Sequence, residues 1–338
     1  MRPSFHPRMV NGPFDDPSLF IPFFFEKRAI IFDAGEMYSL SARDMLKISH
    51  VFVTHTHIDH FAGFDRLLRL FLGREKKLHV YGPEGFLKNV EGKLAGYSWN
   101  LVRNYTNQFA FQVTEVRSGH TISREYPCRN RFHPTGKTTE LPFDGILLRE
   151  PALSVSAIIL DHSIPCLGFS IKERFHVNII KESLAGLGLE VGPWLREFKE
   201  ALFNRCDPDS EFEVKFGKEN RKKFVLGDLA EQIAIVSPGQ KITYVTDVVY
   251  SSSNSEKIVG FAKDSDHLFI EAAFLEEERD MARQKYHLTA RQAGHIAGRA
   301  QVRQFTLFHF SPRYVGMEHI LEEEARKAYL RQLSVVSR

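Results

Sequence analysis

Three histidines and one aspartate lie within positions 55–60, in the segment Thr54-His55-Thr56-His57-Ile58-Asp59-His60. An apolar run precedes this segment and a helical pattern follows it, which places the cluster on a strand-to-helix turn. Imidazole and carboxylate donors without thiolates suit Zn²⁺, with Mn²⁺ or Fe²⁺ as alternatives. We expect His55 and His57 to share one ion, and Asp59 and His60 to face a second. The ordinary alternative is a polar surface loop.

Other ligands must come from distant parts of the chain. Three apolar runs of strand length each deliver a ligand-type residue at the C-terminal end: His162, Asp247 and His309. Taken singly, each histidine would be an ordinary one, but α/β proteins build their sites at this edge. The expected arrangement is His55, His57 and His162 on the first ion, Asp59, His60 and His309 on the second, and Asp247 with a hydroxide between them.

Apolar periodicity predicts alternating strands and helices along the chain. The expected strands are 19–25, 29–32, 51–54, 78–81, 153–160, 167–171, 242–246, 267–270 and 304–308, and the helices are 42–48, 61–72, 84–94, 194–203, 289–299 and 318–333. No linker rich in Gly, Ser or Pro interrupts them. We therefore expect one layered α/β domain over 1–338, with an insertion at about 98–150.

The composition is that of an ordinary globular protein, with 338 residues, 43% hydrophobic and 26% charged. The sequence has no signal-peptide pattern and no apolar stretch of membrane-spanning length, so a cytoplasmic protein without a membrane partner is expected. Three widely spaced cysteines indicate neither a disulfide framework nor a thiolate zinc site. A net charge of +3 permits RNA binding without requiring it.

The order of these motifs resembles the metallo-β-lactamase fold and, within it, the ribonuclease Z (tRNA 3′-endonuclease) family. The segments that carry the resemblance are Leu160–Ser163 with Gly168-Phe169, Ile270-Glu271-Ala272-Ala273-Phe274, Tyr286-His287-Leu288-Thr289 and Phe308-His309-Phe310-Ser311-Pro312-Arg313-Tyr314. They are similar to the family's third-ligand segment, His-Glu-Ala-Thr-Phe motif, His-Ser-Thr motif and terminal T-H-x-S-x-R-Y segment. Ile58, Ile270 and Ala273 stand where the family has Gly, His and Thr.

The resemblance implies a four-layer αββα sandwich and two Zn²⁺ ions per chain. It also implies hydrolysis of tRNA precursors at the 3′ side by a metal-activated hydroxide, and a homodimer. His287 is the expected proton donor to the leaving 3′-oxygen, with Glu271 holding its tautomer. The simpler role for His287 is that of a neighbour to the helix cap at Thr289. Asp59 is expected either to orient the water or only to bind metal.

Residues beyond the metal ligands are expected to contact the substrate. Ser311 and Arg313 can bind a phosphate, and the competing role for Arg313 is an ion pair with a nearby acid. The segment Val191-Gly192-Pro193 is similar to the Gly-Pro part of the family's tRNA-gripping arm, which we place at about 172–203. The candidate RNA contacts are Lys172, Arg174, Lys199, Lys222 and Lys223.

Three functions fit these observations. The favoured one is a zinc-dependent phosphodiesterase of the ribonuclease Z type. The second keeps the fold and metals but takes a small ester, such as a cyclic nucleotide, a lactone, a thioester or a sulfate ester. The third is a metal-stabilised module that only binds RNA. Complete ligand sets with an open water position usually catalyse, which argues against the third.

Overall fold

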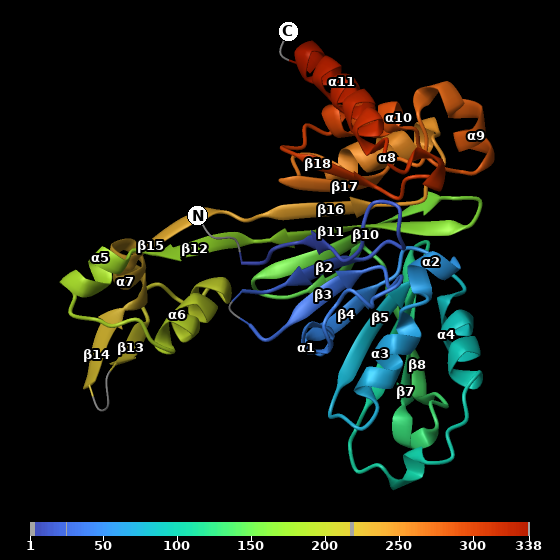
Figure 1. Ribbon diagram of the computed structural model, residues 1–338. Coiled ribbons are helices and arrows are strands. Elements are labelled where there is room, and N and C mark those ends of the chain that lie inside the picture. Colours follow the sequence, from blue (N-terminus) through green and yellow to red (C-terminus); the bar gives the residue numbers. More distant parts are fainter. Residues whose placement is uncertain (1–3, 25, 217–219, 337–338) are drawn as a thin grey trace. The chain divides into compact units, whose positions relative to one another are not determined.

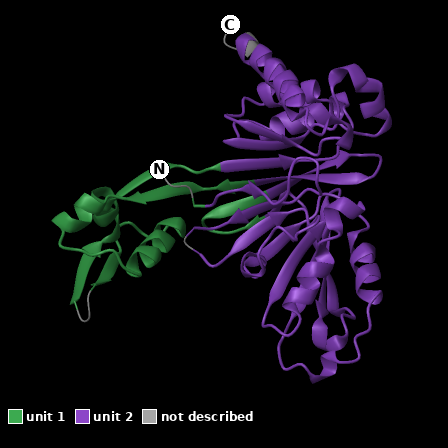
Figure 2. Cartoon of the chain, viewed as in Figure 1, with its two compact units in different colours: residues 1–4, 148–155, 171–240 green, residues 5–147, 156–170, 241–338 purple. Residues whose placement is uncertain are grey.

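The computed structural model describes residues 4–24, 26–216 and 220–336. These form two compact units, shown in Figure 2. Unit 1 contains Ser4, 148–155 and 171–240, and unit 2 contains 5–147, 156–170 and the residues from 241 onward. The single domain expected over 1–338 stays a prediction. No helix in the described residues combines the length and the apolar character needed to cross a bilayer.

The first sheet follows the chain from strand to strand (Figure 1). Its eight strands, in spatial order, are β1 (Arg8–Met9), β2 (Leu19–Pro22), β3 (Ala29–Phe32), β4 (Ile48–Phe52), β5 (Lys77–Gly82), β6 (Ala110–Arg117), β7 (His120–Pro127) and β8 (Thr135–Pro142). The strands from β3 to β6 are parallel, whereas β1–β2–β3 and β6–β7–β8 pair antiparallel. The stretch 98–150 therefore supplies three strands of this sheet.

The second sheet is formed from the later strands. Its spatial order is β18 (Phe305–Phe308), β17 (His267–Glu271), β16 (Lys241–Val245), β11 (Pro165–Glu173), β10 (Leu153–Asp161) and β9 (Ile146–Arg149). The strands β16, β17 and β18 are parallel and belong to unit 2. Their C-terminal ends consequently meet at one edge of the sheet.

Aromatic side chains join the two sheets within unit 2. The Phe32 ring on β3 lies 5.3 Å from that of Phe169 on β11 and 5.9 Å from that of Tyr244 on β16. Phe52 on β4 also contacts Phe169, at 5.5 Å between centroids. All four side chains are fully buried, so the sheets pack face to face around an aromatic core.

Helices cover the outer face of each sheet (Figure 1). The outer core of the first sheet includes side chains from α1 (Ala42–Met45), α3 (Phe64–Phe71) and α4 (Phe86–Ala95). That of the second sheet includes side chains from α8 (Ser252–Ala262), α9 (Arg279–Gln284), α10 (Ala290–Arg299) and α11 (Glu318–Val336). Two helical layers around two sheets confirm the expected four-layer αββα sandwich.

The helix expected at 61–72 is in fact two helices. Helix α2 covers Ile58–Phe61 and α3 begins at Phe64. Gly63 lies between them, and its backbone N–H donates to the carbonyl of Ala34 at 2.8 Å. Because this bond goes to a residue outside the helix, the helix is interrupted at Gly63. Asp59 and His60 therefore belong to α2.

Unit 1 has two small antiparallel sheets, β12 (Phe175–Ile179) with β15 (Ala234–Pro238) and β13 (Glu211–Phe216) with β14 (Asn220–Val225). Its helices are α5 (Lys181–Gly186), α6 (Trp194–Phe203) and α7 (Leu226–Ile233). Trp194, Phe198, Val214 and Leu229 are buried in its core. The arm expected at 172–203 lies in this unit. Of the helices and strands that lie wholly within the arm, only the helix at 194–203 was predicted.

Candidate metal centre

Polar residues follow the C-terminal ends of several strands in unit 2. Asp33 follows β3, Asp247 follows β16 and His309 follows β18, all with left-handed backbones at φ values of 56°, 33° and 61°. Such a conformation costs roughly 1–3 kcal/mol in a residue other than glycine. Residues with such strained backbones are found mostly at functional sites. The turn it produces ends each strand abruptly, directly beside the ligand-type side chain.

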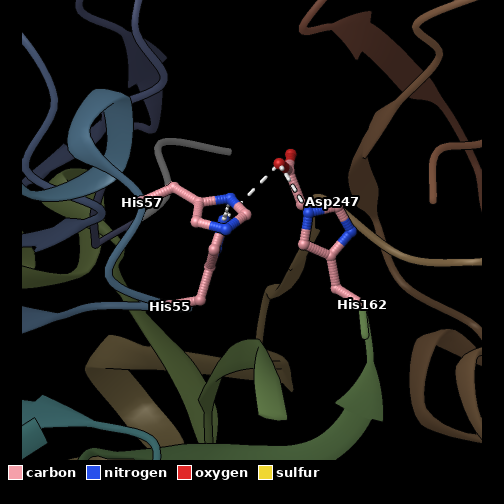
Figure 3. A group of neighbouring side chains, drawn as sticks. All are labelled: His55, His57, His162 and Asp247. Atoms are coloured by element: carbon pink, nitrogen blue, oxygen red, sulfur yellow. Dashed lines mark hydrogen bonds and ion pairs between the residues drawn. The ribbon is translucent and has the colours of Figure 1, made fainter. Parts of the chain in front are cut away.

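The first donor group consists of His55, His57, His162 and Asp247, drawn in Figure 3. Nε2 of His55 lies 3.0 Å from Nδ1 of His57. Oδ2 of Asp247 lies 3.5 Å from Nε2 of His55 and 3.5 Å from Nε2 of His162. The four donor atoms all lie within 4.8 Å of one another, which is close enough to surround one ion.

The second donor group consists of Asp59, His60 and His309. Oδ2 of Asp59 lies 3.2 Å from Nε2 of His309 and 3.4 Å from Nε2 of His60. The other oxygen of Asp247, Oδ1, lies 3.2 Å from Nδ1 of His309 and 3.5 Å from Nε2 of His60. Each oxygen of Asp247 therefore faces a different donor group, which is the geometry of a bridging carboxylate.

Two buried nitrogens in this region, Nε2 of His60 and Nδ1 of His309, have no hydrogen-bond partner among the described residues. Leaving a buried polar atom unpaired costs about 1–3 kcal/mol. A cation would satisfy both nitrogens, and the surrounding imidazoles and carboxylates are donors that divalent transition metals prefer. The donor groups therefore fit divalent metal ions.

Asp33, which no sequence motif indicated, orients one histidine of each donor group, His55 and His60. Its Oδ2 accepts from Nδ1 of His60 at 2.9 Å and from the hydroxyl of Tyr244 at 2.9 Å. The hydroxyl of Thr54 donates to Oδ1 at 2.9 Å and lies 3.1 Å from Nδ1 of His55. Since Nδ1 of His60 donates to Asp33, Nε2 is the ring nitrogen left to face a metal.

His162 is oriented in the same way by a backbone carbonyl. Its Nδ1 donates to the carbonyl oxygen of Tyr286 at 2.9 Å, which leaves Nε2 with its lone pair toward Asp247. Tyr286 holds a left-handed backbone at φ 62°. The segment that carries Tyr286 is therefore connected directly to the first donor group.

The protonation states of His55 and Asp247 suit metal binding. Burial lowers the pKa of His55 to about 2, so its imidazole is neutral at pH 7. Burial alone would raise the pKa of Asp247, but the charges of His309, His60 and His287 bring it well below its usual range. Asp247 is consequently an ionised carboxylate, as a bridging ligand requires.

His287 lies beside both donor groups and is paired with Glu271. Its ring centroid is 5.3 Å from that of His162 and 5.3 Å from that of His309. Nδ1 of His287 donates to Oε2 of Glu271 at 2.9 Å, and the N–H of Val248 donates to Oε1 at 2.7 Å. Burial lowers the pKa of His287, but the Glu271 carboxylate outweighs this effect and raises it to about 9. The Glu271 carboxylate therefore favours the protonated form of His287.

A cavity of about 360 Å³ adjoins the second donor group. Its lining includes Asp59, His287, His309, Ser311 and Arg313, so the structure brings the predicted phosphate-binding residues next to the predicted catalytic ones. Nη1 of Arg313, however, donates to Glu278. The alternative role considered for this arginine, an ion pair with a nearby acid, is present.

The candidate RNA contacts all belong to unit 1, and three of them have partners within it. Arg174 Nη1 donates to the carbonyl of Phe203 at 3.0 Å, and Lys222 Nζ donates to the carbonyl of Leu187 at 2.9 Å. The third, Lys223, pairs with Glu211 at 2.9 Å. Burial lowers the pKa of Lys199, and Lys172 is exposed. A role for these residues in RNA binding stays a prediction.

Comparison with known proteins places the chain among metallo-hydrolase relatives. The family model described as "Beta-lactamase superfamily domain" matches residues 28–140. A solved structure, the metallo-beta-lactamase fold protein YhfI from Bacillus subtilis, superposes with a TM-score of 0.54 at 14% identity. That superposition covers 96% of this chain and 94% of YhfI, and it supports the fold alone.

Curated relatives are more specific. Ribonuclease Z from Deinococcus radiodurans is 27% identical over 289 residues, which are 84% of this chain and 83% of the relative. Ribonuclease Z from Crocosphaera subtropica is 30% identical over 295 residues, which are 84% of this chain and 77% of the relative. Both the sequence motifs and the strand-end geometry agree with these matches, and the chain belongs to the ribonuclease Z family, built on the metallo-β-lactamase fold.

Proposed function

We propose that this protein is a dinuclear zinc phosphodiesterase that cuts tRNA precursors at the 3′ side. The observation that carries the proposal is the division of the two Asp247 oxygens between two donor groups, with His287 beside both and bonded to Glu271. Membership of the ribonuclease Z family supports tRNA as the substrate class. The homodimer and the cytoplasmic location expected from the sequence stay predictions.

Seven side chains would hold the metals. His55, His57 and His162 would bind one ion, Asp59, His60 and His309 the other, and Asp247 both. When bound, such ions activate water for attack on phosphorus and offset the charge of the phosphate oxygens. These imidazole and carboxylate ligands favour zinc, with Mn²⁺ or Fe²⁺ as alternatives.

His287 would supply the proton that the leaving 3′-oxygen needs. Glu271 holds Nδ1 of His287, so Nε2 is the atom left to donate. The backbone N–H of Val248 fixes Glu271 in turn, and the ring cannot easily turn away from the cavity. A positioned general acid of this kind typically contributes 10²- to 10⁴-fold to the rate.

Asp59 would orient the attacking water or bind only metal. Burial would raise the pKa of Asp59, but the hydrogen bond from His309 and the charges of His60 and His309 keep it well below the ordinary range. The carboxylate is thus ionised and accepts hydrogen bonds. Ser311 lines the cavity and offers a hydroxyl to a phosphate oxygen.

The test uses zinc-loaded protein with two substrates, a tRNA precursor and bis-p-nitrophenyl phosphate. Cleavage of both is expected. His287→Ala should lower the turnover of the tRNA precursor by about 10²-fold or more while zinc content stays at the wild-type value. His319→Ala is the matched control, because His319 is an exposed histidine on α11.

Each alternative gives a different result. Cleavage of the small diester without the tRNA precursor would favour an enzyme for small esters. Cleavage of neither would favour a binding module. If His287→Ala lost zinc together with activity, His287 would be a structural or ligand residue rather than the acid.

A further inference from the structure

The cavity beside the second donor group contains a cation to which neither the sequence nor the family resemblance gave a role. Lys285 lines this cavity together with His287, Ser311 and Arg313. It is exposed and directly follows α9. Lys285 and Arg313 are the two long cationic side chains in the described lining, so they are the ones that can meet a second phosphate there.

Arg313 is already engaged. Its guanidinium pairs with Glu278 through Nη1 and lies over the Phe274 ring at 5.3 Å from the centroid. Glu278 also accepts from the hydroxyl of Tyr314. The charge of Arg313 is therefore largely balanced, and a phosphate would have to compete with Glu278 for it.

Among the described residues, the ammonium of Lys285 makes no ion pair or hydrogen bond, and its backbone N–H donates to the carbonyl of Met281 at 2.9 Å. An ammonium on a flexible four-carbon stem is a mobile point charge that binds phosphate well. Lys285 is consequently the available positive charge of this cavity.

The backbone around Lys285 is fixed relative to the donor groups. The next residue, Tyr286, accepts a hydrogen bond from His162 through its carbonyl. His287, two residues on, is bonded through its side chain to Glu271 and through its backbone N–H to the carbonyl of Ala282 at 2.9 Å. The backbone of Lys285 is therefore held in place beside the proposed general acid, His287.

The charge around the cavity indicates which phosphate Lys285 would take. His287 would face the leaving 3′-oxygen. Lys285 lies two residues before it and lines the same cavity, so we place its ammonium on the leaving-group side. Asp15 and Asp16 also line the cavity, and their carboxylates would repel a phosphate. The neighbouring phosphate of the chain is thus most favourably placed near Lys285.

We propose that Lys285 binds a second, non-scissile phosphate: the phosphodiester on the 5′ side of the nucleotide whose 3′-oxygen leaves. This inference rests on the proposed ribonuclease function and specifies how its site grips the polynucleotide. It also explains how the site would prefer a polynucleotide to an isolated diester, because an isolated diester has no second phosphate for the ammonium to contact.

The experiment compares two short RNA precursors that differ at this one phosphate. One has the natural diester, and the other has an uncharged methylphosphonate. For the natural RNA, Lys285→Ala should lower kcat/KM about tenfold, the usual size of a lost charged hydrogen bond. For the methylphosphonate RNA, wild type and Lys285→Ala should be equal. Lys285→Arg should recover most of the loss.

Two further measurements separate a phosphate contact from a general effect. The logarithm of the RNA-binding constant falls linearly with the logarithm of the salt concentration. Lys285→Ala should make this slope about 0.7 less steep, which is the value for one phosphate of a single strand. Arg283→Ala, which removes an exposed cation from the same helix α9 outside the described cavity lining, should leave kcat/KM and the slope unchanged.

The outcomes separate this inference from the proposed function. If wild type cleaves RNA but Lys285→Ala is impaired equally on both RNAs, or on neither, the assignment of Lys285 is wrong while the ribonuclease stands. If wild type hydrolyses bis-p-nitrophenyl phosphate but no RNA, the ribonuclease proposal fails and the assignment of Lys285 fails with it.

Discussion

Asp33 connects the two donor groups through one buried carboxylate. It holds His60 directly and His55 through the hydroxyl of Thr54, and it also accepts from Tyr244. All of its described side-chain partners are donors, so a carboxylate is the group that satisfies them together. A change at this single residue should therefore alter metal binding without removing any ligand.

Asp33→Asn should weaken zinc binding by 10- to 100-fold, because the amide cannot accept from every donor and His60 loses its fixed tautomer. Competition with a chromogenic chelator measures the affinity. Asp44→Asn, which changes a partly exposed carboxylate on α1, is the control and should bind zinc as wild type does. Wild-type zinc affinity in Asp33→Asn would show that the carboxylate has no role in orienting the ligands.

Asp33 also shows which residues of the site can be predicted from the sequence and which cannot. The rule that sites lie at strand ends predicted His162, Asp247 and His309, and the structure places each of them there. Asp33 also follows a predicted strand, at 29–32, but it has no histidine beside it. A single carboxylate without a nearby motif gives too little signal to be selected.

At the scale of elements, predictions succeeded where apolar periodicity was strong. The strands at 29–32, 242–246 and 304–308 correspond to β3, β16 and β18 within one residue at each end. Helix α8 was missed because its first turn is rich in serine, although Ser251 caps it by accepting from the N–H of Asn254. The strands β13 and β14 were missed because they are rich in charged residues.

The position of α2 depends on close contact between backbones. A Cβ on Gly63 would lie 2.1 Å from the carbonyl oxygen of Gly35, and a Cβ on Gly35 would lie 2.4 Å from that of Asp59. The N–H of Ala34 also donates to the carbonyl of His60 at 2.9 Å. No sequence pattern reveals such contacts, because they depend on how two distant segments pack.

Gly63→Ala should destabilise the protein by about 1–3 kcal/mol, because backbone atoms must move to admit the methyl group. Urea unfolding of zinc-free protein measures this change. Zinc affinity should also fall, since α2 carries Asp59 and His60.

Gly92→Ala is the matched control for that substitution. Gly92 is an exposed residue in the middle of α4, and a Cβ there meets nothing within 4 Å. This variant should be about 0.5–1 kcal/mol more stable than wild type, through helix propensity alone. Equal effects of the two substitutions would contradict the packing argument for Gly63.

At the scale of the whole molecule, the donor groups join the two sheets of unit 2. The histidines at 55, 57 and 60 and Asp59 follow β4 of the first sheet, whereas His162, Asp247 and His309 follow strands of the second. Each donor group therefore takes residues from both sheets. Ions bound to them would act as cross-links between the halves of the sandwich, in addition to any catalytic role.

Removal of the metals should accordingly lower the melting temperature of the protein. A ligand at about a thousandfold excess over its Kd stabilises by roughly 4 kcal/mol, which corresponds to a shift of roughly 6 °C for a chain of this size. Calorimetry before and after treatment with a chelator measures the shift, and added zinc should restore it. In Asp247→Asn, which loses the charge that both donor groups share, the chelator should change the melting temperature far less. An identical melting temperature for zinc-loaded and chelated wild type would mean that no ions join the sheets, because binding to the folded state alone must stabilise it.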